Sequence, residues 1–396
     1  MKILILGSKE YPLGSNNGYD PIPSGGIERY IENLVEELEE YKDVEILIMT
    51  RKFPGISCRE KFGNKTIYRV KWIKGLLLRN PTFNFSSFLR SSILKFDIIF
   101  CVGVIASIFG VILSTLKGVP VIHHFSGIHH KEAQYKKGIK RMLHLAEIVA
   151  YRFCGDMIFL SEENENKFKE TMKFLPRRVH IIPTGININH FSLVPRNLLS
   201  SPLRLIAVGR LVEVKGIQDF IEALIIIRDK IDFIVSIVGE GPYRKVLERV
   251  VEGGGIKKNI VFEGNVPPNR VVDYLRGAHI YVLPSYSEGL PQSLLEAMAC
   301  GLACIVSDIG LPIKHGETGI VVPPSDANAI AQAIIGLAAC PSLMETLGKN
   351  GRNYIFLNHS RQIWAASIYK LSRTLILRKL NYRKLKNNPE SVNDKY

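Results

Sequence analysis

Short apolar runs alternate with helix-like patterns along most of this 396-residue chain. Such runs, bounded by turn residues, are typical of buried strands in a parallel sheet. In the first half we expect strands at residues 2–7, 44–50, 97–102, 120–124 and 156–161. In the second half we expect them at residues 203–209, 233–239, 260–263, 280–283, 303–307 and 319–322. The alternation predicts an α/β chain with two doubly wound, Rossmann-like domains.

The two series of strands meet near residues 181–187, and a polar, proline-containing stretch at 191–202 is typical of a linker. We therefore expect a first domain at residues 1–190 and a second at 191–359. Two such domains commonly bind ligands in the cleft between the carboxyl ends of their strands.

One stretch, Ile98 to Leu116, carries no charge over a length that would suit a membrane span. A buried strand followed by an apolar helix explains it better, because Gly103 marks a turn inside it. The apolar run that follows Met1 is too short for a secretion signal. The six cysteines show no metal-binding or Cys-x-x-Cys spacing and are expected to be reduced core residues. We expect a cytoplasmic protein.

The formal charge is +15, but residues 191–360 hold 16 basic and 16 acidic side chains. The excess therefore belongs to the first half and to the tail. A nucleic-acid-binding protein would not leave its middle neutral, so we expect no nucleic-acid partner. The segment 373–386 mixes basic residues with leucines, and it is either a solubilising tail or a contact to an anionic membrane surface.

A helix predicted at residues 136–153 offers a second contact of that kind. Basic side chains cluster at its start, and its apolar residues share one face at helical spacing. These are Ile139, Met142, Leu143, Ala146, Val149, Ala150 and Phe153. We expect this face to pack on its own domain; if exposed, it would dock on anionic lipid as a peripheral contact at the inner face of the membrane.

A glycine turn, Gly25-Gly26, opens a predicted helix after a long loop. Glycines at a helix start let backbone N–H groups approach an anion closely. The alternative is an ordinary turn.

Two cations follow the first strand of the second domain. Arg210 comes directly after Gly209, and Lys215 lies five residues further on. At the carboxyl end of a strand, an arginine fork and a lysine point charge suit a diphosphate. The alternative is that both are solvated surface charges.

Two glutamates follow the strand at 280–283. Glu288 lies in a polar loop, and Glu296 lies on the helix after it among leucine, alanine and methionine. A carboxylate in so apolar a segment needs a partner, and sugar or ribose hydroxyls would suit it. The alternative is an exposed Glu288 and a Glu296 paired with a structural arginine.

Taken in order, these elements resemble the family 4 (group 1) glycosyltransferases of the GT-B fold, over roughly residues 1–370. The matching elements are the Gly25-Gly26 turn, Ile182-Pro183-Thr184-Gly185-Ile186-Asn187, Gly209-Arg210 with Lys215-Gly216, Val238-Gly239-Glu240-Gly241-Pro242, and the glutamates Glu288 and Glu296 around Gly289-Leu290-Pro291. The glutamate pair is the most specific of them. The resemblance also implies that the segment 360–396 crosses back to the first domain as a helix.

The resemblance implies retaining, metal-independent transfer of a sugar from a nucleotide-sugar donor to a glycan or lipid-linked acceptor, without a cofactor. Arg210 and Lys215 would stabilise the leaving diphosphate, Glu288 would contact the donor sugar, and Glu296 the ribose. The donor would also be contacted by Gly25, Gly26, Gly209, Gly239, Gly289, Leu290 and Ser293. A nucleotide-sugar epimerase or a glycan phosphorylase of the same fold is the alternative activity, and a catalytically inactive binding module is a third interpretation.

The chain departs from the family pattern at one point on the acceptor side. Many members carry His-Gly after a strand, where this chain has Ser126-Gly127. His124, two residues earlier, is the expected catalytic substitute if the strand continues that far. A metal cluster of neighbouring histidines, including His129 and His130, is conceivable, but we expect no metal site.

Overall fold

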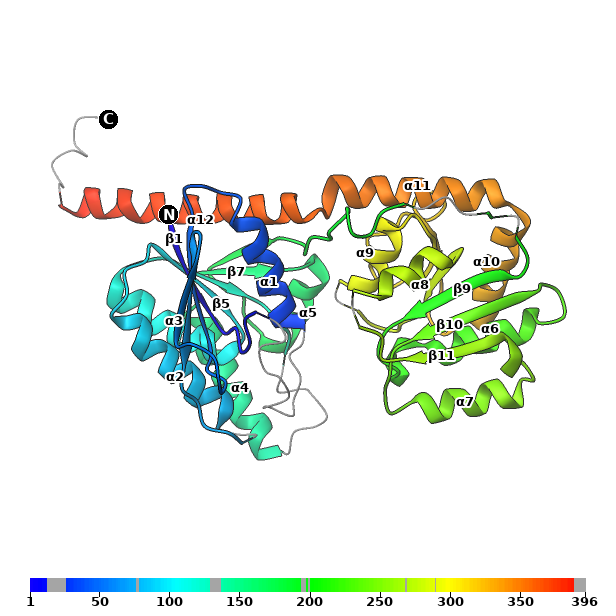
Figure 1. Cartoon of the computed structure of the whole chain (residues 1–396), viewed down its shortest axis with the longest axis horizontal. Helices are drawn as coiled ribbons and strands as arrows, with labels where there is room; N and C mark the ends of the chain where they lie inside the picture. The colour runs from blue at the N-terminus through cyan, green and yellow to red at the C-terminus, as the bar shows by residue number, and fades with distance from the viewer. Residues whose placement is uncertain are drawn as a thin grey trace. The chain divides into compact units, whose positions relative to one another are not determined.

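The computed structural model describes residues 1–12, 26–75, 78–128, 137–193, 197–198, 200–267, 269–288 and 290–387. The chain divides into two compact units (Figure 1). Unit 1 comprises residues 1–184 and the chain from Trp364 onward, and unit 2 comprises residues 185–363. Each unit is a sheet with helices packed against it, and all strand pairs but one are parallel.

Unit 1 is built on an eight-stranded sheet in the order β3-β4-β2-β1-β5-β6-β7-β8. All neighbours pair in parallel except β3, which is antiparallel to β4. The strands are β1 (Lys2–Leu6), β2 (Glu45–Arg51), β3 (Arg59–Phe62), β4 (Lys65–Val70), β5 (Ile98–Val102), β6 (Val121–His124), β7 (Asp156–Phe159) and β8 (Arg178–Ile181). Its helices are α1 (Gly26–Leu38), α2 (Arg79–Ser92), α3 (Val104–Lys117), α4 (Lys137–Arg152), α5 (Glu162–Met172) and most of α12 (Arg361–Asn387).

Unit 2 is built on a six-stranded, fully parallel sheet in the order β11-β10-β9-β12-β13-β14. The strands are β9 (Leu203–Val208), β10 (Phe233–Val238), β11 (Ile260–Gly264), β12 (Ile280–Leu283), β13 (Ala303–Ser307) and β14 (Ile320–Val322). Its α-helices are α6 (Ile217–Ile227), α7 (Arg244–Gly253), α8 (Val271–Gly277), α9 (Gln292–Ala299), α10 (Ala327–Ala339) and α11 (Pro341–Asn358). Strand order reverses between β9 and β12, the pattern of a doubly wound nucleotide-binding sheet.

Both sheets are buried on two faces, which explains their continuous apolar strands. In β9, Leu205 packs into one core of unit 2 while Ile206 packs into the other. Successive side chains of a strand point to opposite faces, so both must be apolar. The predicted α/β fold class with two doubly wound sheets is confirmed, and each predicted strand is found within about two residues.

The sequence did not predict three strands of unit 1, namely β3, β4 and β8. β4 interleaves apolar residues with lysine, threonine and arginine, while β3 and β8 are short and partly exposed at the two edges of the sheet. An edge strand has a neighbour on one side only, and charged residues are common there. No continuous apolar run therefore marked these segments.

The C-terminal helix α12 returns to unit 1, as the family resemblance implies. Trp364 is buried and meets Tyr30 of α1 edge-on, with ring centroids 4.8 Å apart. Tyr369 stacks on Tyr41 and donates its hydroxyl hydrogen to Asp43 at 2.9 Å. Aromatic burial of this kind anchors the helix to the first sheet's core.

The uncharged stretch ending at Leu116 is the strand β5 followed by the helix α3, as expected. Over the part of the chain that the structure describes, no single helix has the length and apolar character of a membrane span. Taken together, α10 and α11 have that length and composition, but a bend of 105° separates them. The expectation that all cysteines lie in the core is wrong for Cys58 and Cys340, which are exposed. Both lie outside regular apolar runs, Cys58 before β3 and Cys340 between α10 and α11.

Helix α4 does not bury the whole apolar face that the sequence suggested. Ala150 is buried, and Leu143 and Ala146 are half-buried. By contrast, four large apolar side chains form an exposed stripe along the helix, with exposed fractions between 40% and 67%. This α4 stripe consists of Met142, Leu145, Val149 and Phe153, the last of which directly follows the helix. The expectation of packing on the domain is therefore wrong for Met142, Val149 and Phe153.

We expect Phe168→Ala to destabilise unit 1 by about 3–5 kcal/mol. The Phe168 ring is fully buried, and four other aromatic rings lie with their centroids 5.4–5.6 Å from it. Truncation leaves a cavity that so crowded a cluster cannot close. Urea unfolding of the variant measures the loss. Phe62→Ala, at a 54% exposed ring, is the control and should change the free energy of unfolding by about 0.5 kcal/mol or less.

Candidate functional site

The topological switch point of unit 2 lies between β9 and β12, which are neighbours in the sheet. Parallel sheets bind ligands outside the carboxyl ends of their strands at such a point. Gly209 and Arg210 come directly after β9, and Ser285 to Glu288 begin one residue after the end of β12. The fold therefore brings together the two segments that the sequence analysis singled out separately.

The two loops are held against each other by their backbones. The N–H of Tyr286 donates to the carbonyl of Val214 at 2.9 Å. Gly216 has φ +64°, and a Cβ at that position would lie 2.0 Å from the carbonyl oxygen of Pro284. Only glycine satisfies both the left-handed backbone and the close approach. The approach fixes Lys215, the last residue of a short 3₁₀ turn (Glu213–Lys215), beside the β12 loop.

Lys215 and Glu288 form an ion pair across the switch point. The ammonium nitrogen of Lys215 lies 2.5 Å from Oε1 of Glu288, and the two side chains are 20% and 9% exposed. The fully buried Ser285 hydroxyl donates to the same oxygen at 2.7 Å. The alternative of an exposed Glu288 is therefore wrong: its carboxylate is largely desolvated and held by two donors.

Arg210 is exposed, and within the described ranges no carboxylate forms an ion pair with it. The position before it, Gly209, has open space where a Cβ would stand. Gly209 also donates its N–H to Val238 at 2.9 Å, which fixes the end of β9 beside β10. The switch point thus carries one cation compensated by Glu288 and one that is available to an anionic ligand.

A second polar group, missed by the sequence analysis, supports the β12 loop. The Tyr286 hydroxyl donates to Oδ2 of Asp219 at 2.8 Å and accepts from the Gln218 side chain at 2.5 Å. Burial raises the pKa of the Asp219 carboxyl, and the bond from Tyr286 only partly offsets it. Burial and Asp219 together raise the pKa of Tyr286. The sequence feature that could have indicated this group is the aromatic side chain of Tyr286, which lies in an otherwise polar loop after a strand.

The remaining donor-side candidates lie on or beside α9. Leu290 packs against the core of unit 2, and Ser293 accepts a hydrogen bond from the buried Tyr281 hydroxyl at 2.8 Å. Burial raises the pKa of Tyr281, so that hydroxyl stays a neutral donor. Glu296 is half-buried, with the buried Leu295 and Ala297 on either side in sequence.

The glycines expected to contact the donor differ in what surrounds them. Gly239 has φ +139°, and a Cβ there would lie 1.9 Å from the carbonyl oxygen of Gly209, so a close strand-end contact already accounts for this glycine. Gly26 is the first residue of α1. Glu28 in the same first turn is buried, and its Oε1 lies 3.7 Å from the ammonium nitrogen of Lys9. Gly25 and Gly289 lie outside the described residues.

His124 belongs to unit 1, where it ends β6. Its side chain is 6% exposed and lies against Tyr30, with ring centroids 4.1 Å apart. Desolvation lowers its pKa to about 4, so the imidazole is neutral near pH 7. The strand ends here, so Ser126 does not continue its face as the sequence analysis assumed; Ser126 and Gly127 lie half-buried in the following segment. A catalytic role for His124 stays a prediction.

His123 points to the opposite face of the sheet from His124, because neighbouring residues of a strand alternate. It is fully buried, and desolvation lowers its pKa to about 3. Across the part of the chain that the structure covers, no group of three or more His, Cys, Asp or Glu side chains is placed to hold a metal ion. His129 and His130 lie outside that part.

Two family models match the chain, one for each half. The model of the glycosyl transferases group 1 matches residues 195–354, and the model of glycosyltransferase family 4 matches residues 24–190. The first match covers the switch-point residues of unit 2, and the second covers most of the sheet of unit 1.

Named relatives agree with the family matches. The amylovoran biosynthesis glycosyltransferase AmsK of Erwinia amylovora is 33% identical over 171 residues, which are 41% of this chain and 42% of the relative. The GDP-mannose-dependent alpha-(1-6)-phosphatidylinositol monomannoside mannosyltransferase of Mycolicibacterium smegmatis is 25% identical over 361 residues, which cover 85% of this chain and 92% of that protein. The chain spans only 40–42% of the length of the first three curated relatives it matches.

A solved structure shares the fold. The sucrose-phosphate synthase of Thermosynechococcus elongatus superposes with a TM-score of 0.76 at 23% sequence identity, over 95% of this chain and 99% of that chain. The likeness shows the GT-B fold expected from the sequence.

We expect the buried histidines to make unit 1 less stable as the pH falls from about 6.5 to about 5. The unfolded chain binds protons at histidine in this range, while His124, with a folded pKa of about 4, does not. Its contribution is therefore lost on acidification, by up to about 1.4 kcal/mol per pH unit. Urea unfolding at the two pH values should show a smaller difference for His124→Gln than for the natural chain. An equal pH dependence in both proteins would contradict the prediction; His190→Gln, at an exposed histidine, is the control.

Proposed function

We propose, because this chain belongs to family 4 (group 1) of the glycosyltransferases, that it transfers a sugar from a nucleotide-diphosphate sugar to a glycan or lipid-linked acceptor with retention of configuration. The observation that carries the proposal is the Lys215–Glu288 pair beside the available Arg210 at the switch point of unit 2. These groups suit both parts of such a donor, the diphosphate and the sugar.

The two cations suit the leaving group. When the bond between the anomeric carbon and the diphosphate breaks, its electron pair passes to a phosphate oxygen, and negative charge develops there. Arg210 can donate a fork of hydrogen bonds to that charge, and Lys215 adds a point charge from a fixed position. Because these side chains supply positive charge, we expect the reaction to need neither a metal ion nor a cofactor.

The two carboxylates suit the neutral part of the donor. Glu288 is held by Lys215 and Ser285 at one oxygen, which orients its carboxylate to accept hydrogen bonds from sugar hydroxyls. Glu296 is half-buried on α9 and is proposed to accept from the ribose. The backbone from Leu290 to Ser293, where α9 begins, is proposed to donate to the phosphates.

Arg210→Ala and Lys215→Ala should each raise the barrier to sugar transfer by about 2–4 kcal/mol, because each removes a preorganised cation from the developing charge. The experiment first screens UDP, GDP, ADP and CMP by calorimetry without added metal, and then measures turnover with the conjugates of the nucleotide that binds. Lys349→Ala, at an exposed lysine of α11, is the control and should behave like the natural chain. If Arg210→Ala and Lys215→Ala both turn over as fast as the natural chain, the leaving-group role is refuted.

The acceptor side is proposed to work at an anionic membrane surface, with the protein a peripheral cytoplasmic one. The α4 stripe exposes four large apolar side chains, and Lys137, Arg141 and Arg152 on the same helix are exposed as well. The one acidic residue of α4, Glu147, is buried. Apolar and basic groups exposed together on one helix suit the interface of an anionic bilayer.

Replacing Met142 and Leu145 by serine should reduce binding to vesicles of phosphatidylcholine with phosphatidylglycerol at least tenfold, because both side chains are about 60% exposed and would lose their burial in the interface. Co-sedimentation at a series of lipid concentrations measures the effect. Leu357→Ser, at a 66% exposed leucine of unit 2, is the matched control. Undiminished binding of the double variant would exclude the α4 stripe as the docking element.

A further inference from the structure

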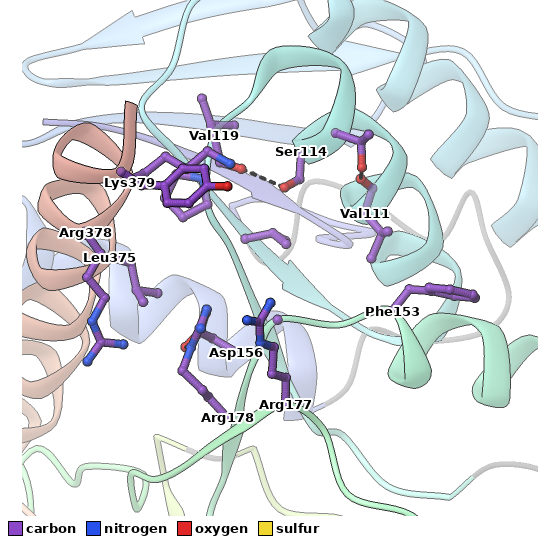
Figure 2. A pocket seen from close by; sticks show the side chains of 15 residues that line it. Val111, Ser114, Val119, Phe153, Asp156, Arg177, Arg178, Leu375, Arg378 and Lys379 are labelled. Atoms are coloured by element: carbon purple, nitrogen blue, oxygen red, sulfur yellow. Dashed lines mark hydrogen bonds and ion pairs between the residues drawn. The ribbon is translucent and has the colours of Figure 1, made fainter. Parts of the chain in front are cut away.

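Unit 1 contains a cavity of about 570 Å³ on the side away from the carboxyl ends of its strands (Figure 2). Val121, Asp156 and Arg178 line it, and they are the first residues of β6, β7 and β8. The cavity therefore lies at the amino ends of these strands. Parallel α/β sheets bind their substrates at the opposite edge, so the proposed sugar transfer does not use this cavity.

Several separate parts of the chain line the cavity. The last turns of α3 contribute Ser114 and Thr115, and the strand starts contribute Asp156 and Arg178. The far part of α12 contributes Leu375, Arg378, Lys379 and Tyr382. Figure 2 shows Arg378 and Lys379 projecting from α12, with Arg177 and Arg178 coming from the segment at the start of β8. Basic side chains from two distant parts of the sequence thus line one cavity.

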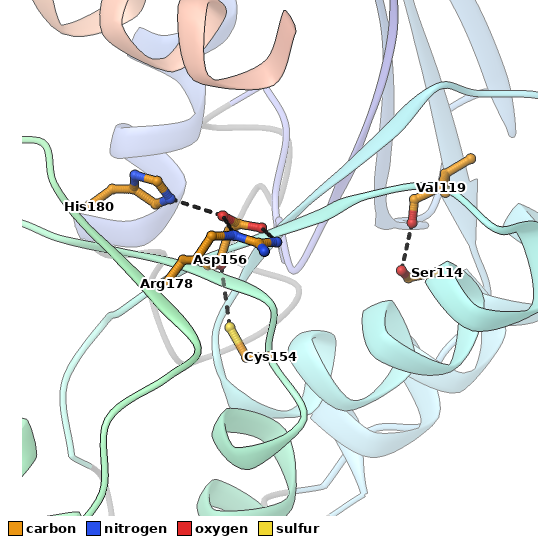
Figure 3. A network of polar contacts seen from close by, with 6 residues as sticks. All are labelled: Ser114, Val119, Cys154, Asp156, Arg178 and His180. Atoms are coloured by element: carbon orange, nitrogen blue, oxygen red, sulfur yellow. Dashed lines mark hydrogen bonds and ion pairs between the residues drawn. The ribbon is translucent and has the colours of Figure 1, made fainter. Parts of the chain in front are cut away.

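The only carboxylate among the lining residues is already compensated. Arg178 donates to both oxygens of Asp156 at 2.7 Å, and the His180 ring lies 3.0 Å from one of them (Figure 3). Burial alone would raise the pKa of Asp156, but these partners outweigh it and lower the pKa. Asp156 is therefore ionised and fully satisfied, and its charge is balanced by Arg178.

Three cations of the cavity have no such balance. In the described segments, no carboxylate forms an ion pair with Arg177, Arg378 or Lys379. Arg177 and Arg378 are exposed, and Lys379 is half-buried. Like charges brought together by the fold favour an anion between them, and guanidinium groups match the geometry of phosphate oxygens.

Apolar and aromatic side chains also line the cavity beside these cations. Leu375 is buried at the cavity, while Phe153 and Tyr382 line it with 67% and 65% of their surface exposed. Exposed aromatic side chains beside basic ones are characteristic of the headgroup level of a bilayer. Phe153 is also the last member of the α4 stripe, so the cavity and the surface proposed to contact the membrane share this side chain.

We propose that this cavity binds the phosphate headgroup of an anionic phospholipid. Arg177, Arg378 and Lys379 contact the phosphate, and Phe153 and Tyr382 lie in the interface around it. The inference rests on the proposed membrane contact of the α4 stripe and assigns that contact its lipid partner.

A soluble lipid tests the cavity without a membrane. Calorimetry on the full chain compares dihexanoyl phosphatidylglycerol below its micelle concentration, dihexanoyl phosphatidylcholine and inorganic phosphate. We expect phosphatidylglycerol to bind at least tenfold more tightly than either of the others. Arg378→Glu with Lys379→Glu should abolish this preference, whereas Lys370→Glu, at an exposed lysine of the same helix, should retain it.

Arg177 lines the cavity from the segment at the start of β8 and not from α12. Arg177→Gln therefore tests the site even if the α12 double variant fails to fold, and it should weaken the binding of phosphatidylglycerol. Equal binding of both lipids, or unchanged binding in Arg177→Gln and the double variant, would overturn the proposal. Inorganic phosphate that binds as tightly as the lipid would replace it with a site for a free anion.

Vesicles separate this proposal from that of the α4 stripe. Loss of vesicle binding in the Met142 and Leu145 variant, with the soluble lipid still bound, supports both proposals. If the natural chain binds the soluble lipid but no vesicles, the membrane contact fails while the headgroup site stands. If it binds vesicles but shows no preference for soluble phosphatidylglycerol, the headgroup site fails alone.

Discussion

Parallel pairing of β9 with β12 is the constraint on which the candidate site depends. Because the two strands are parallel neighbours, their carboxyl ends lie at one edge of the sheet, and the segments after them meet although some seventy residues separate them. Gly216 then allows the backbones to approach closely enough for Lys215 to reach Glu288. The candidate site lies at that edge because the strand order reverses there, which is where parallel sheets bind ligands.

Compensation of buried charge is a second theme of the molecule. Glu288 and Asp156 are both largely buried carboxylates, and each is held by a cation and a further polar group. Removing water from a carboxylate is costly unless such partners replace it. At both places cations remain for which the described residues supply no carboxylate partner: Arg210 at the switch point, and Arg177, Arg378 and Lys379 around the cavity. These surplus cations are the groups to which we assign anionic ligands.

Local patterns were sufficient for most of the fold. Each central strand is an apolar run because both faces of its sheet are covered, and such runs are visible in the sequence. Partly exposed or charged strands such as β3, β4 and β8 leave no such run, which is why they were missed. The prediction for the apolar face of α4 failed for a related reason. Periodicity gives the direction in which side chains point but not what covers them. On this helix Met142 is exposed whereas Ala150 is buried.

The sequence by itself determined the α/β class, the two doubly wound sheets and the identity of the charged residues at the strand ends. These features follow from spacing along the chain, and they need no knowledge of what lies beside a residue. The tertiary structure alone decided that Lys215 pairs with Glu288, that His124 is buried against Tyr30, and that Arg378 lines the same cavity as Arg177. Pairing, burial and the accumulation of charge depend on distances between segments remote in sequence, and only the packed chain sets those distances.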